Sequence, residues 1–159
     1  MSKRNKEGCV GIILRIFGIE GPVPAPPLPY RLRDKFLSSA ENSFFYVLNE
    51  VLGPEYYLIA KVSLSDLFSV PKSRVSRAAL KRIRMKHVDF VICDAKTMQP
   101  LLGVELDDAG LRSQRGDDTF VEKVFETAKL PLLRVTAAKA YVPGEIAEMI
   151  DRALEANEE

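Results

Sequence analysis

The chain has too few cysteine and histidine residues for a disulfide framework or a structural zinc site. Its 159 residues include two cysteines and one histidine. Cys9 and Cys93 lie far apart in different sequence contexts, and neither has the spacing of a metal-ligand pair. Cys93 has the surroundings of a buried strand residue. This cysteine usage is typical of a reducing compartment, so we expect a cytoplasmic protein.

The chain also has no hydrophobic run long enough to cross a membrane. The apolar stretch 9–19 contains eleven residues and is interrupted by Arg15, whereas a transmembrane helix needs about 20 apolar residues. No small-residue cleavage site of a signal peptide is evident after it. Three interpretations stay open: an amphipathic anchor with weak membrane contact, an extra strand or helix on the core, and a degenerate export signal. We favour the first two over export.

Neither the net charge nor the composition points to one class of partner. The net charge is +1, with 47% hydrophobic and 28% charged residues, which are ordinary globular values. The length fits one domain with its own core plus a short extra segment. Five prolines in residues 21–29 predict a stiff linker that joins neither a helix nor a central strand. We therefore predict a basic and apolar segment (1–20), a proline-rich linker (21–30) and a folded domain (31–157).

Hydrophobic periodicity and turn residues predict an α/β domain. A capping box at Ser38 and Glu41 opens a helix that ends near Leu52, before Gly53 and Pro54. Strands are predicted at 56–62, 88–93, 101–106 and 131–135, and helices at 119–129 and from Pro143 onward. Residues 64–86 combine a short apolar piece, Pro71 and a basic stretch, and their structure is left open. The order is αβββαβ, a mixed sheet flanked by helices, with an appended C-terminal helix.

Three carboxylates are predicted to meet at one end of this sheet. Glu105 and Asp107 share a face of their strand because side chains alternate along it. A hairpin with the preceding strand brings Asp89 to the same place. Such a group is costly unless a positive charge lies within it, and the usual one is a hard divalent cation such as Mg²⁺. Asp89 as a strand-end residue tied to a turn, and Asp107 as a turn residue, stay open as alternatives.

The strand order and the acidic strands resemble the PD-(D/E)XK restriction-endonuclease-like superfamily. More closely, stretches 37–45, 86–91, 103–108 and 130–135 resemble a bacterial single-domain family labelled domain of unknown function 2726. Very short patch repair endonucleases carry a similar Glu-x-Asp strand. The resemblance implies a restriction-endonuclease-like core and hydrolysis of DNA phosphodiester bonds with Mg²⁺ or Mn²⁺.

The same resemblance implies roles for individual residues. Asp89, Glu105 and Asp107 would bind the metal, Glu41 of the first helix would lie beside it, and Lys86 would lend its charge. Glu41 is equally explained as the capping residue of its helix. The superfamily usually has a lysine at the position of Asp107. The family tends to carry a histidine where this chain has Leu111, and an arginine-aspartate pair where its helix opens at 116–118. A catalytically inactive nucleic-acid-binding or adaptor module on the same fold is therefore the alternative function.

A basic stretch without an acidic residue precedes the strand of Asp89. We predict that it contacts the phosphate backbone of DNA, although a solvated helix face is the ordinary explanation of such a run. The candidate nucleic-acid-binding residues, with two arginines of a later loop, are Lys72, Arg74, Arg77, Lys81, Arg82, Arg84, Arg112 and Arg115. The oligomeric state is left open.

Overall fold

The computed structural model describes residues 26–71, 76–107 and 115–156, and within these ranges the side chains of all residues except 76 and 115–118. The chain divides into two units, Met1–Asp34 and Lys35–Glu159. In the first unit, residues 26–34 contain no helix or strand. The predicted segment 1–20, with its apolar stretch 9–19, lies outside the described residues, so the predicted three-part division stays a prediction.

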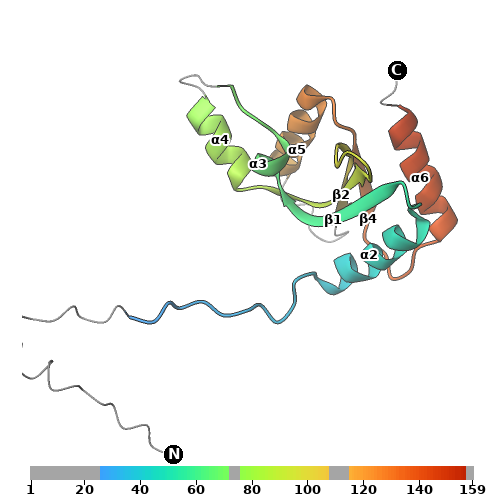
Figure 1. Cartoon of the computed structure of the whole chain (residues 1–159), viewed down its shortest axis with the longest axis horizontal. Coiled ribbons are helices and arrows are strands. Elements are labelled where there is room, and N and C mark those ends of the chain that lie inside the picture. Colours follow the sequence, from blue (N-terminus) through green and yellow to red (C-terminus); the bar gives the residue numbers. More distant parts are fainter. Residues whose placement is uncertain (1–25, 72–75, 108–114, 157–159) are drawn as a thin grey trace, which may run out of the picture. The chain divides into compact units, whose positions relative to one another are not determined.

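The second unit is a four-stranded mixed sheet flanked by helices (Figure 1). Its elements in chain order are α2 (Ser39–Val51), β1 (Tyr56–Ser63), α3 (Leu64–Leu67), α4 (Ser76–Arg84), β2 (His87–Asp94), β3 (Pro100–Asp107), α5 (Arg115–Ala128), β4 (Leu132–Thr136) and α6 (Pro143–Glu155). The strands follow the order β1-β2-β3-β4, in which β3 and β4 are parallel and the other neighbours antiparallel. The predicted α/β order with an appended C-terminal helix is confirmed.

Helix ends follow the local sequence closely. Ser38 and Glu41 form the predicted capping box, and α2 ends at Val51 with Leu52 as its C-cap, directly before the glycine-proline pair. Pro143 is in the first turn of α6, where its missing N–H costs no hydrogen bond. One boundary differs from the sequence prediction, because α5 begins at Arg115 rather than at residue 119. Residues 64–86, whose structure was left open, contain the short α3 and the basic α4.

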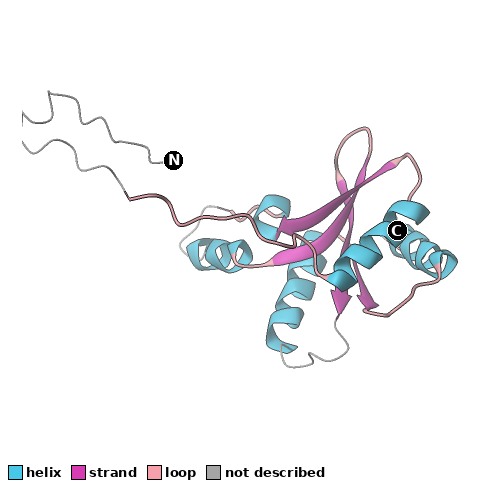
Figure 2. Cartoon of the chain, turned by 90° about the horizontal axis from the view of Figure 1, so that it is seen from below, coloured by secondary structure: helices cyan, strands magenta, loops and turns pink. Residues whose placement is uncertain are grey.

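Helices cover both faces of the sheet and create two apolar cores (Figure 2). The first core, under α2 and α6, contains Phe44, Leu48, Phe90, Ile92, Leu102, Val104, Val135, Ile146 and Ile150. The second core, under α3, α4 and α5, contains Leu64, Ile83, Val88, Val91, Cys93, Val121 and Phe125. Strand β2 contributes to both cores, which explains why its sequence is almost continuously apolar. In the described ranges, no helix combines the length and apolar character required to traverse a bilayer.

The alternation of side chains breaks at one place in the β1–β2 pair. Ala60 packs on the first core and Val62 on the second, although a regular strand would direct both to the same face. Lys61 between them has a φ of 57°, in the left-handed region that costs a residue with a side chain about 1–2 kcal/mol. On β2, Phe90 and Val88 are divided between the cores in the same way. Lys61 and Asp89 therefore lie where the strand pair passes from one layer to the other.

Gly103 allows α5 to pack directly on β3. A Cβ atom at this position would lie 2.4 Å from Cε1 of Phe125, a fully buried ring of the second core. The close contact brings the whole of α5, and with it Glu122, near the end of the sheet that carries the acidic residues. Only glycine leaves room for this ring against the strand.

We expect Gly103→Ala to lower the free energy of unfolding by about 1–3 kcal/mol, since the added methyl group overpacks the second core. Urea denaturation monitored by circular dichroism measures the change. Gly144→Ala in α6 is the matched control, because a Cβ there meets nothing within 4 Å and alanine favours a helix by up to about 1 kcal/mol. Equal stability of both variants would contradict the role assigned to Gly103.

Candidate functional site

Asp89 lies at the point where β2 and β3 separate. Regular pairing of the two strands is recorded as far as Phe90 opposite Val104. Beyond it, Oδ2 of Asp89 accepts a hydrogen bond from the backbone N–H of Leu106 at 3.1 Å, and Oδ1 accepts one from Nζ of Lys61 at 3.0 Å. The aspartate thus replaces a ladder hydrogen bond and connects β1, β2 and β3. Its side chain is 23% exposed, so its carboxylate is partly open to a ligand.

The Lys61 ammonium is shared between Asp89 and Glu41 of α2. Nζ of Lys61 lies 2.5 Å from Oε1 of Glu41, while Oε2 of Glu41 accepts a hydrogen bond from the N–H of Ser38 at 2.8 Å. One carboxylate therefore completes the capping box with one oxygen and holds the lysine with the other. The two explanations that the sequence offered for Glu41, capping and a place in the site, are compatible.

The carboxylates of β3 share a second cation, Arg134 of β4. Arg134 lies directly opposite Glu105 in the parallel strand pair. Its Nη2 is 2.8 Å from Oε2 of Glu105, and its Nη1 is 2.9 Å from Oδ1 of Asp107. Its Nε is 3.1 Å from Oε1 of Glu122, which α5 supplies. Glu105, which is partly buried and requires a partner, has an arginine.

Both cations remain charged at neutral pH. Burial lowers the pKa of Lys61, but hydrogen bonds to Glu41 and Asp89 outweigh this effect and raise the pKa above its ordinary value. Burial likewise opposes the charge of Arg134, and attraction to Glu105, Asp107 and Glu122 raises its pKa overall. Burial raises the pKa of Glu41, but the hydrogen bonds from Lys61 and Ser38 lower it by more than burial raises it. The pKa of Glu41 therefore lies below its ordinary value. Neither Lys61 nor Arg134 is poised as a proton acceptor.

The donor chemistry at this end of the sheet fits a hard divalent cation. Among the described residues, the carboxylates of Glu41, Asp89, Glu105, Asp107 and Glu122 form ion pairs with two cations, Lys61 and Arg134. These seven side chains carry more negative than positive charge, and oxygen is the ligand that Mg²⁺ prefers. Within the described ranges, no three Asp, Glu, His or Cys side chains are arranged to hold a metal ion. Lys61 and Arg134 lie between the carboxylates, so an ion would have to displace one of them.

The residues of this site lie within the part of the chain that matches a known family. Residues 33–154 match the family described as Protein of unknown function (DUF2726). The chain belongs to this family. No curated protein and no solved structure gave a match. The DUF2726 match includes all five carboxylates and both cations of the site, whereas membership of the endonuclease-like superfamily stays a prediction.

The predicted site residues of this DUF2726 chain fall into two ion-paired sets. Asp89 and Glu41 join through Lys61, and Glu105 and Asp107 join through Arg134. The backbone N–H of Leu106, between the two β3 carboxylates, connects the sets through its hydrogen bond to Asp89. Lys86 is half-buried between α4 and β2. Lys61, which the sequence prediction did not include, contacts Asp89.

The predicted basic residues are described only in part. Arg77, Lys81, Arg82 and Arg84 lie on α4 with exposed side chains. The guanidinium of Arg82 lies 3.7 Å from the centre of the Phe120 ring, a cation–π contact that joins α4 to α5. Lys72, Arg74 and Arg112 lie outside the described residues. Arg115 is described only as the first residue of α5.

The sequence prediction missed Lys61, Arg134 and Glu122. A single lysine within an otherwise apolar strand and a single arginine within another were signals that a partner was required. Pairing the strand of Arg134 in parallel with that of Glu105 would have identified that ion pair. The left-handed backbone of Lys61 has no local sequence signal, because neither glycine nor asparagine stands there.

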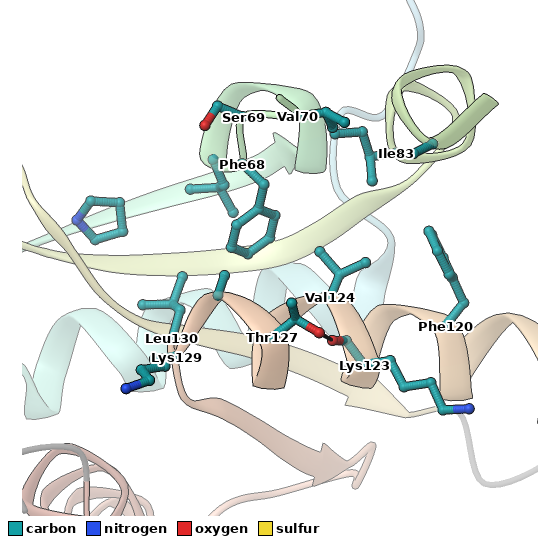
Figure 3. A pocket seen from close by; sticks show the side chains of 14 residues that line it. Phe68, Ser69, Val70, Ile83, Phe120, Lys123, Val124, Thr127, Lys129 and Leu130 are labelled. Carbon is teal, nitrogen blue, oxygen red and sulfur yellow. Dashed lines mark hydrogen bonds between the residues drawn. The ribbon is translucent and has the colours of Figure 1, made fainter. Parts of the chain in front are cut away.

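A separate groove of about 810 Å³ lies between α4 and α5. Figure 3 shows apolar side chains of the two sides, among them Phe68, Ile83 and Val124, facing one another. Lys123 and Lys129 are the charged side chains among the described residues of its lining, which includes no aspartate or glutamate. Without a carboxylate and with mostly apolar side chains, this lining has the chemistry of a binding surface. The acidic end of the sheet is therefore the candidate catalytic site.

The Glu41–Lys61 pair predicts a dependence of stability on acid. Because the folded-state pKa of Glu41 is depressed, its stabilisation is present above the ordinary value of 4.5 and is lost as the pH falls through the lower folded value. Glu41→Gln, which keeps the capping geometry, should lower the unfolding free energy by about 1 kcal/mol at pH 7. The difference from wild type should narrow below pH 4.5. Urea titrations from pH 3 to pH 8 measure it, with exposed Glu50→Gln of the same helix as control. A difference that is constant with pH would contradict the assignment.

Proposed function

We propose that this protein is a divalent-cation-dependent nuclease that hydrolyses phosphodiester bonds of DNA. The proposal rests on the acidic end of the sheet, where, among the described residues, carboxylates from α2, β2, β3 and α5 surround the two cations Lys61 and Arg134. A group of carboxylates attracts a cation strongly because its members repel one another. The resemblance of the acidic strands to endonuclease-like proteins supports the same chemistry.

Each side chain has a role that its contacts support. Asp89 and Glu105 are the inner ligands, since both are partly buried and lie on neighbouring strands. A divalent cation held there would supply charge stabilisation at the phosphate oxygens and lower the pKa of the attacking water. Asp107, 47% exposed at the end of β3, is the outer carboxylate.

Lys61 supplies the positive charge that the Asp107 position does not. Its ammonium is protonated and is fixed by Glu41 and by the strained backbone at its own position. A charge held in place in this way costs little reorganisation when a phosphate oxygen approaches. We infer that Lys61 donates to the scissile phosphate, while Glu41 acts as a positioning residue through its contact with Lys61.

Helix α4 is the proposed contact with the phosphate backbone of DNA. Its four described cations are exposed, and the helix leads directly into β2, the strand of Asp89. Phosphate contacts fix the register of a protein on DNA without reading its sequence. A surface of this kind suits a nuclease of low sequence selectivity.

A catalytically inactive DNA-binding module is the second candidate function. The observation that favours it is the pairing of each carboxylate set with a resident cation, Lys61 or Arg134, in place of a group that is already open to a metal. DNA affinity that is unaffected by EDTA, with no cleavage, would support it over the nuclease.

Glu105→Gln should abolish metal-dependent nicking of supercoiled plasmid, a loss of at least about 100-fold, because it removes an anionic ligand without changing side-chain size. Agarose-gel nicking assays with Mg²⁺ and with Mn²⁺ measure the rate. Exposed Glu148→Gln on α6 is the matched control. Nicking that survives in Glu105→Gln at the wild-type rate would place the chemistry elsewhere. No nicking by wild type, with several forms of DNA, would favour the inactive module.

Charge reversal on α4 should weaken DNA binding under either function. For Lys81→Glu with Arg84→Glu, we expect at least about a tenfold loss of affinity at low salt and a smaller slope of log affinity against log salt, by about two. Fluorescence anisotropy with a labelled duplex measures both quantities. The control reverses two exposed lysines away from α4, Lys96 and Lys139. Equal effects of the two double variants would show that net charge, rather than this helix, governs binding.

A further inference from the structure

Arg134 makes a contact that bears directly on how the acidic end of the sheet takes up a cation. Each of its three guanidinium nitrogens lies beside a different carboxylate: Nη2 at 2.8 Å from Glu105, Nη1 at 2.9 Å from Asp107 and Nε at 3.1 Å from Glu122. Its side chain is 21% exposed, so these contacts are only partly screened by water. The arginine thus reduces the repulsion between the two β3 carboxylates, whose charge it offsets in part.

We propose that Arg134 is an internal counter-ion that competes with the divalent cation for Glu105 and Asp107. The proposal rests on the proposed function, because it concerns the metal of the same site. The oxygens that Arg134 contacts belong to the carboxylates assigned to the metal. A divalent ion bound to them would also lie close to a fixed positive charge, which opposes binding. Metal affinity is therefore set by the exchange of one cation for the other.

Glu122 can hold the guanidinium of Arg134 after it leaves Glu105 and Asp107. It comes from α5 rather than β3, and its side chain is 53% exposed. Arg134 and Glu122 both line a hollow of about 430 Å³ whose other walls are largely apolar residues of α5 and the start of β4. A guanidinium released by Glu105 and Asp107 keeps its ion pair with Glu122 and has room beside it. The exchange consequently needs a side-chain movement and no change in the sheet.

Metal binding measured directly tests this inference. Isothermal titration of Mn²⁺ into the metal-free protein at pH 7 should show tighter binding for Arg134→Met than for wild type, by about tenfold or more, because the competing charge is removed. Arg134→Lys keeps the charge but loses the fork that contacts two carboxylates at once. It should bind Mn²⁺ more tightly than wild type by about threefold. Arg152→Met of α6, whose Nε donates to a helix carbonyl, is the control and should match wild type.

Thermal unfolding supplies a readout that does not depend on catalysis. Metal-free Arg134→Met should unfold at a lower temperature than wild type, since its carboxylates lose their counter-ion, and Mn²⁺ should raise its Tm by more than it raises that of wild type. If Arg134→Met does not fold without metal, Arg134→Lys carries the test alone.

The outcomes separate this inference from the proposed function. If wild type binds Mn²⁺ and neither Arg134 variant binds it more tightly, Arg134 does not compete with the metal. The proposed metal site would be unaffected by that result. Equal tightening by Arg134→Met and by the control Arg152→Met would also overturn the inference, because the net charge of the protein would then explain the gain. Failure of wild type and of every Arg134 variant to bind Mn²⁺ would overturn the metal-dependent function, and the inference with it. Binding that appears only in the Arg134 variants would support it.

Discussion

The carboxylate of Asp89 is the interaction on which the arrangement of the site depends. Its two oxygens have different partners, the ammonium of Lys61 on β1 and the backbone N–H of Leu106 on β3. Because a partly buried carboxylate requires such partners, it holds the three strands together where regular β2–β3 pairing ends. Without it, the end of β3 that carries the acidic residues would lose its hydrogen bond to β2, and Lys61 would lose one of its two carboxylate partners. The separation of the strands and the assembly of the site therefore have one common cause.

Charge balance then decides what this end of the sheet can accept. Two cations are distributed among five carboxylates, and each cation bridges residues of different elements. The ion pairs limit repulsion within the folded protein, and the proposed divalent cation would reduce the repulsion that remains among these described carboxylates. Lys61 and Arg134 differ in this respect. Lys61 is fixed by its strained backbone and by two carboxylates, whereas Arg134 has a half-exposed alternative partner in Glu122.

Apolar packing away from the site determines where the carboxylates of Glu122 and Glu41 lie. The absence of a side chain at Gly103 allows the ring of Phe125 to lie against β3, and this contact sets the height of α5 over the sheet. Glu122 is one turn before Phe125 on the same helix, so the apolar contact also determines where its carboxylate lies. On the other face, Phe44 and Leu48 anchor α2 in the first core and thereby fix Glu41. The two apolar cores thus hold the polar site from both faces of the sheet.

Local sequence determined the elements of this protein and the carboxylates of its candidate site. Alternation and helical periodicity predicted the strand order and the appended helix, the capping box predicted the start of α2, and the carboxylate pattern pointed to Asp89, Glu105 and Asp107. Only the tertiary structure decided which cations those carboxylates contact. Arg134 contacts Glu105 because β3 and β4, which α5 connects, pair in parallel. Lys61 contacts Asp89 where its own backbone adopts a left-handed conformation, which the local sequence does not signal. Periodicity depends on neighbours along the chain, whereas ion pairing depends on strand register and backbone strain, which long-range packing sets.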